Sequence, residues 1–189
     1  TFGPGQVYPD RLAAAWAFVP ILNAELRALA AAGADFVQID EPWMQQHPDK
    51  ARQYGLKTLA RALDGVKGTT AVHICFGYAA IIHQRPSGYS FLPELAQCSC
   101  RQVSIETAQS HLDCSVLQSL DGKQVMVGCI DLADPQVESA DTVVQRIADS
   151  IALLPYDAAR DEADRNDADI YVIPVAGGTP RNVATLPGA

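Results

Sequence analysis

The stretch Thr70-Ala71-Val72-His73-Ile74-Cys75-Phe76 is a nearly continuous apolar run that contains two metal-ligating side chains. Apolar runs of about four to eight residues are typical of strands buried on both faces of a parallel sheet. His73 and Cys75 are two positions apart, so on a strand both side chains point to the same face. The stretch therefore predicts a buried strand with a pair of ligand-type groups near its carboxyl end.

Similar runs alternate with helical patterns on both sides of this strand. Strands are predicted at residues 35–40, 70–76, 102–106, 124–130 and 169–175. Helices are predicted at residues 10–32, 49–63, after 106 through 117, and from a cap at Ser139 to about 154. Gly33 ends the first helix, and Pro20 is expected to kink or restart it. This alternation indicates a parallel α/β domain with right-handed crossovers.

The number of units limits the architecture. Five β/α units are too few for a closed eight-stranded barrel, which typically needs ~250 residues. Two arrangements remain: a complete open doubly wound sheet, or the later part of a barrel whose first strands are missing. In either case we expect one domain over residues 1–189. The loop at residues 77–93 is too long for a simple connector, and the acidic residues 157–169 are expected to form a solvated connection.

Composition excludes several classes of protein. The chain has 189 residues and a net charge of −8, which argues against binding to nucleic acid. No apolar run is expected to reach the ~20 residues of a membrane span. Five cysteines and no visible signal peptide favour reduced thiols in the cytoplasm. The P-loop, G-x-G-x-x-G and G-x-S-x-G motifs are absent from the sequence, which removes the commonest nucleotide and acyl-transfer functions.

Three strand ends carry candidate metal ligands. Glu106 ends one apolar strand and is costly to bury unpaired, while Cys129 ends the next. Together with His73 and Cys75 they supply the nitrogen, sulfur and oxygen atoms that zinc takes. If the strands are neighbours, their carboxyl ends converge on one mouth. The plainer alternative is that a His or Cys in a strand is packing, because free Cys behaves as a small hydrophobe.

A further strand end carries two carboxylates, Asp40 and Glu41, within Gln38-Ile39-Asp40-Glu41-Pro42. The carboxyl edge of a parallel sheet is where ligands bind. Adjacent residues of a strand point to opposite faces, so at most one of these acids can face the mouth. The alternative is a solvated acidic turn. Packing or surface positions are expected for the remaining cysteines and histidines: Cys98, Cys100, Cys114, His47, His83 and His111.

Taken in order, these segments resemble the C-terminal catalytic barrel of the cobalamin-independent methionine synthase family. Residues 36–42 resemble its Q-I-D-E-P strand. Residues 72–78 resemble its H-x-C zinc strand, in the form found in shorter methionine-synthase-like proteins and in epoxyalkane:coenzyme M transferase. Ser104-Ile105-Glu106 is similar to the strand whose Glu binds zinc, and residues 131–139 resemble the following loop and helix start. The resemblance covers nearly the whole chain.

The resemblance implies a (β/α)8 TIM-barrel-like fold, with about the last five units present and the first strands missing. It implies a Zn²⁺ ion bound by His73, Cys75 and Glu106, which lowers the pKa of a substrate thiol so that the thiolate exists at neutral pH. The thiolate would attack a methyl or alkyl donor, and the acceptor would be homocysteine-like or coenzyme M-like. Asp40, with Glu41 beside it, corresponds to the strand that holds the amino-acid end of the acceptor.

The sequence departs from the family pattern in two places. Ala176, in Pro174-Val175-Ala176-Gly177, stands where the family has its last zinc-binding Cys, and Ala133 stands where methionine synthases carry a His. Cys129 is the candidate replacement ligand, because it ends the preceding strand. Two alternatives follow for function. One is a degenerate relative without catalysis, or a chain that acts only as a homo-oligomer or with a complementing subunit. The other is a uroporphyrinogen decarboxylase-like barrel, which would not need His73 and Cys75.

Overall fold

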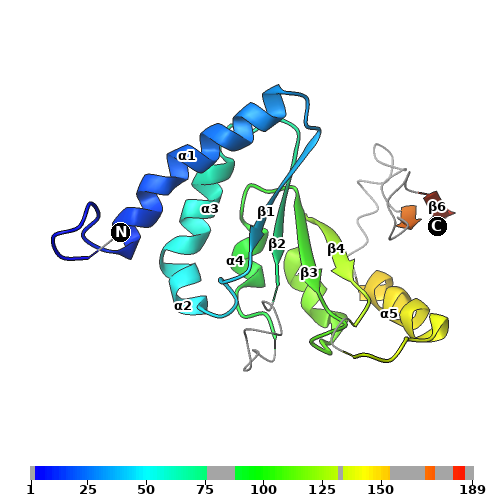
Figure 1. The fold of residues 1–189 in the computed structure, drawn as a ribbon. Helices are drawn as coiled ribbons and strands as arrows, with labels where there is room; N and C mark the ends of the chain where they lie inside the picture. Colours follow the sequence, from blue (N-terminus) through cyan, green and yellow to red (C-terminus); the bar gives the residue numbers. More distant parts are fainter. Residues whose placement is uncertain (1–2, 76–87, 132–133, 154–168, 173–180, 186–189) are drawn as a thin grey trace. The chain divides into compact units, whose positions relative to one another are not determined.

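The protein is described by a computed structural model that covers residues 3–75, 88–131, 134–153, 169–172 and 181–185. It divides into two compact units, Thr1–Leu154 and Pro155–Ala189. The first unit holds a four-stranded sheet and the helices around it (Figure 1). Because all the candidate residues within the described ranges lie in this unit, it is the part that positions the site.

The first unit begins with helix α1, Arg11–Ala31, which Asp10 caps by accepting a hydrogen bond from the amide of Ala13 at 2.8 Å. The helix continues through Pro20 and does not restart there. Ala32 is its C-cap, and the next residue, Gly33, has a φ of 103°, the left-handed conformation that favours glycine. The amides of Gly33 and Ala34 then bond back to Ala30 and Leu29, which satisfies two carbonyls of the last turn.

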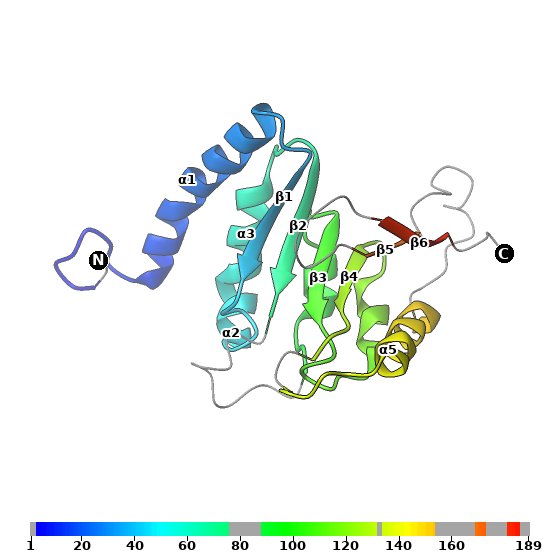
Figure 2. The ribbon, with the colours of Figure 1, turned by 45° about the vertical axis from the view of Figure 1, so that its right-hand side comes forward.

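The sheet is parallel and has the strand order β1-β2-β3-β4 (Figure 2). Its strands are β1 Phe36–Glu41, β2 Thr69–Ile74, β3 Gln102–Glu106 and β4 Gln124–Gly128. All four predicted positions are confirmed to within two residues at the described ends. Because consecutive strands are neighbours and run the same way, all their carboxyl ends lie at one edge.

Helical segments connect the strands. They are α2 Pro48–Lys50, the π-helical turn η1 Ala51–Gly55, α3 Leu56–Leu63, α4 Leu92–Ala96, the 3-10 helix η2 Cys114–Leu120 and α5 Ala140–Leu153. The helix predicted after residue 106 is largely wrong. His111 has a φ of 49°, which a helix cannot accommodate, so turns precede η2. Ser139 caps α5 as predicted, its Oγ accepting from the amide of Thr142 at 3.2 Å.

One face of the sheet forms the core. Val72, Ile74, Val103 and Ile105 point to this face, and each is at most 1% exposed. They pack with leucines of the helical segments, namely Leu59, Leu63, Leu92, Leu95, Leu117 and Leu120. The alternation of strand side chains sends the intervening residues to the other face. The sheet therefore has one apolar face covered by helical segments and a second face that carries more polar side chains.

The second face carries polar side chains and opens to solvent at its borders. Gln38 and Asp40 of β1 are exposed, and so are Phe36 and Met126, with exposed fractions of 43% and 52%. A parallel sheet is normally covered on both faces. Within the described residues, the helical segments pack against one face of this sheet.

The second unit corrects one prediction. The strand predicted at residues 169–175 was expected to extend the parallel sheet, yet β5 Asp169–Val172 pairs antiparallel with β6 Arg181–Thr185 in a two-stranded sheet. The described parallel sheet therefore has four strands and not five. Residues 173–180, which include Ala176, lie outside the described ranges. An alternating apolar pattern identifies a strand but not its partner, which explains the difference.

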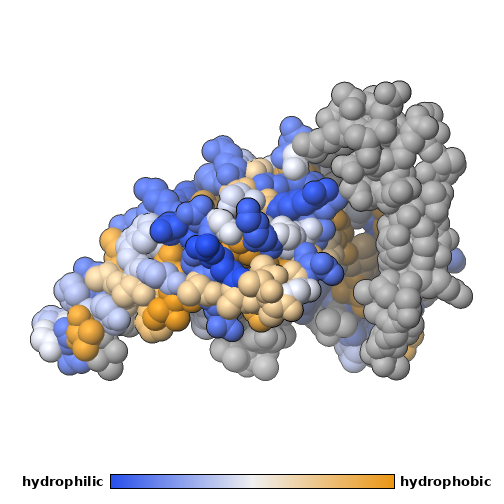
Figure 3. Space-filling model, turned by 90° about the horizontal axis from the view of Figure 1, so that it is seen from above, coloured by the Kyte–Doolittle hydropathy of each residue, from blue (hydrophilic) through white to orange (hydrophobic). Residues whose placement is uncertain are grey.

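Helix α1 leaves a large apolar surface exposed. By length and composition alone it could cross a membrane, although the sequence was expected to contain no such run because Pro20, Glu25 and Arg27 interrupt it. In this fold α1 packs against α3 and β1, and the side chain of Asn23 donates to the carbonyls of Ala62 and Asp64. The view from above shows hydrophobic residues on α1 beside a largely hydrophilic amino edge of the strands (Figure 3). The exposed apolar side chains of α1 are Leu12, Trp16, Phe18, Ile21, Leu22 and Leu29.

Candidate functional site

The strand register brings three of the predicted ligands to one face at the carboxyl edge. His73 pairs in register with Asp40 of β1 and with Ser104 of β3. Ile74 pairs with Ile105, so the next residues along, Cys75 and Glu106, reach the same level. His73 and Cys75 share a face, and Glu106 shares a face with Ser104. The nitrogen, sulfur and oxygen donors therefore sit on two adjacent strands, on the polar side of the sheet.

His73 is oriented by a hydrogen bond across the strands. Its Nδ1 lies 3.0 Å from the hydroxyl oxygen of Ser104, which is buried. When Nδ1 carries the proton and donates to this oxygen, Nε2 is left with a free lone pair. The hydrogen bond to one ring nitrogen thus prepares the other nitrogen to bind a metal.

Tyr89 connects the ends of β2 and β3. Its hydroxyl donates to the carbonyl of Ile74 at 3.0 Å and accepts from the amide of Glu106 at 2.9 Å. Burial raises the pKa of Tyr89, as do the negative charges of Glu106 and Cys75, while the hydrogen bond from the Glu106 backbone lowers it. The phenol therefore lies close to both Cys75 and Glu106 and fixes the backbone between them.

The two carboxylates at the end of β1 point to opposite faces, as alternation requires. Asp40 lies on the polar face, in register with His73, and accepts a hydrogen bond from the side chain of Gln38 at 2.8 Å. Glu41 faces the helix side, where it borders a cavity of about 490 Å³ with Phe18 of α1. Burial raises the pKa of Glu41, opposed by hydrogen bonds from the backbone of residues 43 and 44. Asp40 is thus the acid that faces the predicted ligands.

Cys129 lies in a different environment from the other three candidate ligands. It follows β4, whose last residue, Gly128, pairs with Glu106. Burial raises the pKa of Cys129, as does the nearby Cys114 of η2, whereas Arg146 of α5 lowers it. Its thiol donates to the carbonyl of Val127 at 3.5 Å. The structure therefore groups Cys129 with helix-side residues and not with His73, Cys75 and Glu106.

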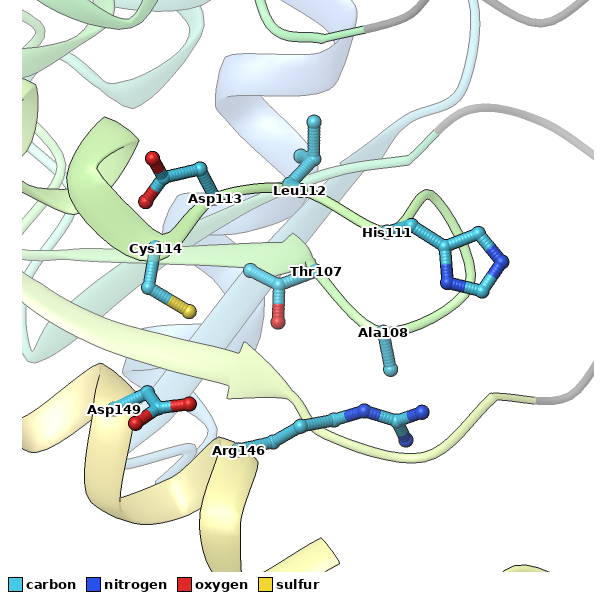
Figure 4. A pocket seen from close by; sticks show the side chains of 8 residues that line it. All are labelled: Thr107, Ala108, His111, Leu112, Asp113, Cys114, Arg146 and Asp149. Atoms are coloured by element: carbon cyan, nitrogen blue, oxygen red, sulfur yellow. The ribbon is translucent and has the colours of Figure 1, made fainter. Parts of the chain in front are cut away.

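A different cavity, of about 350 Å³ and with several polar lining residues, lies beside Cys129 between the end of β3, η2 and α5 (Figure 4). The lining residues are Thr107, Ala108, His111, Leu112, Asp113, Cys114, Arg146 and Asp149. Arg146 contacts Glu138 at 2.5 Å and donates to the carbonyl of Cys129 at 3.0 Å. His111 lies 3.9 Å from the carboxylate of the nearly buried Asp131. Arg146 of α5 therefore links Glu138 to the backbone that follows β4.

The donor set fits zinc in kind. His nitrogen, Cys sulfur and Glu oxygen are all ligands that zinc accepts. The side chains do not yet form a metal cluster: within the described part of the chain, no three His, Cys, Asp or Glu side chains are close enough together to hold an ion. Binding would therefore require His73, Cys75 and Glu106 to be drawn together.

Sequence reasoning overlooked two groups that support these residues. Ser104 could have been found, because it precedes Glu106 by two positions and so shares its face. Tyr89 falls within the long loop predicted at residues 77–93, and nothing in the sequence shows that its hydroxyl would reach two strand ends. Ala133 and Ala176, the two departures from the family pattern, lie outside the described residues.

Comparison with known proteins gives one consistent result. A family model described as "Cobalamin-independent synthase, Catalytic domain" matches residues 8–165. The methionine synthase of Pyrococcus abyssi is 29% identical over 144 residues, 75% of this chain and 39% of that protein. The methionine synthase of Thermococcus kodakarensis is 30% identical, covering 75% of this chain and 40% of that protein.

Among solved structures, a B12-independent methionine synthase from Shewanella sp. W3-18-1, in complex with selenomethionine, is similar with a TM-score of 0.71. It is 34% identical, and the match covers 79% of this chain and 46% of that chain. The chain therefore spans less than half the length of these relatives. The α/β fold with its parallel sheet is shared with a methionine synthase, over the part that the chain contains.

Proposed function

The chain belongs to the cobalamin-independent synthase catalytic-domain family, and on that premise we propose that it takes part in methyl or alkyl transfer to a thiol. The observation that carries the proposal is the position of His73, Cys75 and Glu106 on one face at the carboxyl edge of β2 and β3. In parallel α/β proteins this edge is where substrates bind. We propose a homocysteine-like or coenzyme M-like thiol as the acceptor.

Each residue of this face has a role in the proposal. His73, Cys75 and Glu106 hold the metal, and Ser104 keeps His73 in the tautomer that binds through Nε2. A zinc ion held there would lower the pKa of the acceptor thiol. Asp40, exposed beside His73, binds a cationic amino group of the acceptor. Tyr89 maintains the spacing of the strand ends that carry Cys75 and Glu106.

We propose further that transfer requires additional barrel strands from a complementing subunit or a second copy. Two observations support this. The polar face of the sheet is open at Phe36 and Met126, and β1 is an edge strand beside the exposed apolar side chains of α1. Exposed edges and apolar patches of this kind favour association with another chain.

Two measurements test the proposal. The first is the zinc content of the untagged protein, purified without chelators and dialysed against a defined trace of zinc. We expect about one equivalent, which falls when Cys75 is replaced by Ser. The second is methyl transfer from a methylated folate to homocysteine, by the chain alone and with candidate partner subunits. Zinc binding with transfer only in the presence of a partner supports the complementing role.

The family assignment replaces the uroporphyrinogen decarboxylase-like alternative. The degenerate relative without catalysis remains the competing proposal, because Ala176 stands where the family has a Cys. It predicts a folded chain that binds no zinc and transfers no methyl group with any partner. The two measurements above therefore separate the proposals.

A further inference from the structure

Gln45 is a buried polar residue in the connection between β1 and α2. Its exposed fraction is 2%, and it is the largest polar side chain buried within the described part of the chain. A buried amide is costly unless its donor and its acceptor are both satisfied. The partners of Gln45 lie more than 40 residues away in the sequence, in the segment that contains Tyr89.

The side chain of Gln45 holds the backbone on both sides of Tyr89. Its Nε2 donates to the carbonyl of Gly88 at 2.5 Å, and its Oε1 accepts from the amide of Ser90 at 3.4 Å. One amide group therefore makes two contacts with the backbone of residues 88–90. Two contacts fix the orientation of this backbone as well as its position, and Tyr89 lies between them.

Arg52 of η1 attaches the same segment from the surface. It donates through Nη2 to the carbonyl of Ser90, and its Nε pairs with the carboxylate of Glu94 in α4 at 2.9 Å. Both side chains of this ion pair are exposed, and exposed pairs of this kind contribute little to stability. Gln45 is therefore the buried attachment of the segment, and Arg52 is a second attachment that solvent reaches.

The hydroxyl of Tyr89 carries this attachment to the ends of two strands. It donates to the carbonyl of Ile74, which precedes Cys75, and it accepts from the amide of Glu106. A continuous series of hydrogen bonds thus runs from the connection after β1, through Tyr89, to the ends of β2 and β3. Two of the candidate ligands, Cys75 and Glu106, lie where this series ends.

We propose that Gln45 is a positioning residue that acts through Tyr89. By holding the backbone on both sides of Tyr89, it sets the position of the phenol and hence the separation of the strand ends at Cys75 and Glu106. Gln45 has no ligand role of its own. Its role toward a metal rests on the proposed function, in which Cys75 and Glu106 are ligands. The linkage from Gln45 to Glu106 belongs to the chain without metal and can be tested separately.

The test is amide hydrogen exchange, followed by NMR on the zinc-free protein. The amide of Glu106 reports the linkage because it donates to the Tyr89 hydroxyl. The amide of Arg101, hydrogen-bonded at the amino edge of the sheet, reports general changes in stability. Gln45→Met keeps a long side chain but removes the donor and the acceptor. It should raise the ratio of the Glu106 rate to the Arg101 rate by about five- to tenfold, the effect of losing one hydrogen bond. Gln53→Met, at an exposed position on η1, is the matched control and should leave the ratio unchanged.

A double variant shows whether Gln45 acts through Tyr89. Tyr89→Phe removes the acceptor of the Glu106 amide and should itself raise the exchange ratio. Adding Gln45→Met to Tyr89→Phe should then give no further increase, because both changes break the same series of contacts. A further five- to tenfold increase in the double variant would overturn the proposal, and so would an unchanged ratio in Gln45→Met alone.

Arg52→Met keeps the test decisive if Gln45→Met does not fold. Arg52 is exposed, so its replacement leaves the core intact. It should raise the exchange ratio by a smaller factor, whereas Arg61→Met, which breaks an exposed ion pair with Asp64, should not. An unchanged ratio in Arg52→Met would then overturn the proposal.

Zinc affinity, measured separately by dye competition, distinguishes this proposal from the proposed function. It should be lower in Gln45→Met than in the wild type, and equal in Tyr89→Phe and the double variant. A wild-type chain that binds no zinc would contradict the proposed function, while the exchange ratio would still decide whether Gln45 positions the end of β3 through Tyr89.

Discussion

The imidazole Nδ1 of His73 lies 3.0 Å from the hydroxyl oxygen of Ser104, across the boundary between β2 and β3. The contact joins a candidate ligand to a buried group that has no ligand role of its own. Groups of this kind set the tautomer and the orientation of a metal-binding histidine. The relationship therefore links the packing of two strands to the chemistry proposed at their ends.

We predict that Ser104→Ala weakens zinc binding by about 10–100-fold, the range typical for loss of such a supporting hydrogen bond. Competition with a zinc-responsive dye measures the affinity. Ser115→Ala, at an exposed position on η2, is the matched control and should bind zinc as the wild type does. Equal zinc affinity of Ser104→Ala and the wild type would show that Ser104 does not support the site.

Tyr89 provides a second prediction, on stability. Tyr89→Phe removes the hydroxyl that bonds Ile74 and Glu106, and leaves the part-buried amide of Glu106 without this acceptor. The free energy of unfolding should fall by about 1–3 kcal/mol. Urea denaturation measures it. Tyr54→Phe, another half-buried tyrosine, should change it by less than about 0.5 kcal/mol. Similar losses of unfolding free energy in the two variants would show that the Tyr89 hydroxyl does not stabilise the connection between the ends of β2 and β3.

Much of the parallel sheet was predictable because its strands are short apolar runs between helical patterns. The predicted β3, residues 102–106, coincides with the observed strand. The faces of Asp40, Glu41, His73 and Cys75 also followed from alternation alone. What alternation cannot supply is the pairing of distant strands, so the strand at residues 169–172 was wrongly placed in the parallel sheet.

The burial of short connecting segments is a second feature that could not be predicted from the sequence. Cys98 and Cys100 lie in a segment that appears polar in sequence, but the turn folds under α4 and both enter the core. The positive φ of His111 excludes a helix at this position, and the sequence gives no sign of a positive φ at a residue other than glycine. Cys129, the predicted replacement ligand, follows the strand and lies with Cys114 and Arg146. These features depend on contacts made only in the folded chain.

The turn before β2 gives a third prediction. Gly68 has a φ of 85°, and a Cβ added there would lie 2.9 Å from the carbonyl oxygen of Asp35. Gly65 has a φ of 68°, but a Cβ there would meet no atom within 4 Å. Both Ala variants should suffer the left-handed strain of about 1–2 kcal/mol. Gly68→Ala should lose more, because it also clashes. Thermal unfolding compares them, and equal losses would contradict the close approach.

Glu41 gives a fourth prediction, on pH dependence. Burial raises its pKa in the native state, so the native state holds the proton more tightly than the unfolded chain does. The contribution of Glu41 to the stability of the native state is fully present below its pKa in the unfolded chain. It is lost as the pH rises through its higher pKa in the native state. Glu41→Gln removes this loss. The variant should therefore be more stable than the wild type at pH 7, with the difference shrinking toward pH 4.

The control for this prediction is Glu25→Gln. Glu25 borders the same cavity from α1 but is exposed. Glu25→Gln therefore removes an exposed carboxylate from the same cavity and should not give the gain in stability at pH 7 that is expected of Glu41→Gln. A Glu41→Gln variant less stable than the wild type at pH 7 would mean that the charged carboxylate is stabilised by its neighbours, contrary to the effect of burial.

The last prediction separates the candidate zinc ligands. Cys75 shares the polar face with His73 and lies level with Glu106, so Cys75→Ser should abolish measurable zinc binding. Cys129 lies with Cys114 and Arg146, so Cys129→Ser should change zinc affinity by less than about twofold, since removing a direct ligand would cost far more. Ala176→Cys adds a thiol where the family has a zinc-binding Cys, and should tighten binding. Equilibrium dialysis against zinc, with circular dichroism to confirm folding, measures all three. Loss of zinc binding in Cys129→Ser would instead identify Cys129 as the replacement ligand. If the wild-type chain binds no zinc and Ala176→Cys binds none either, the metal proposal is wrong.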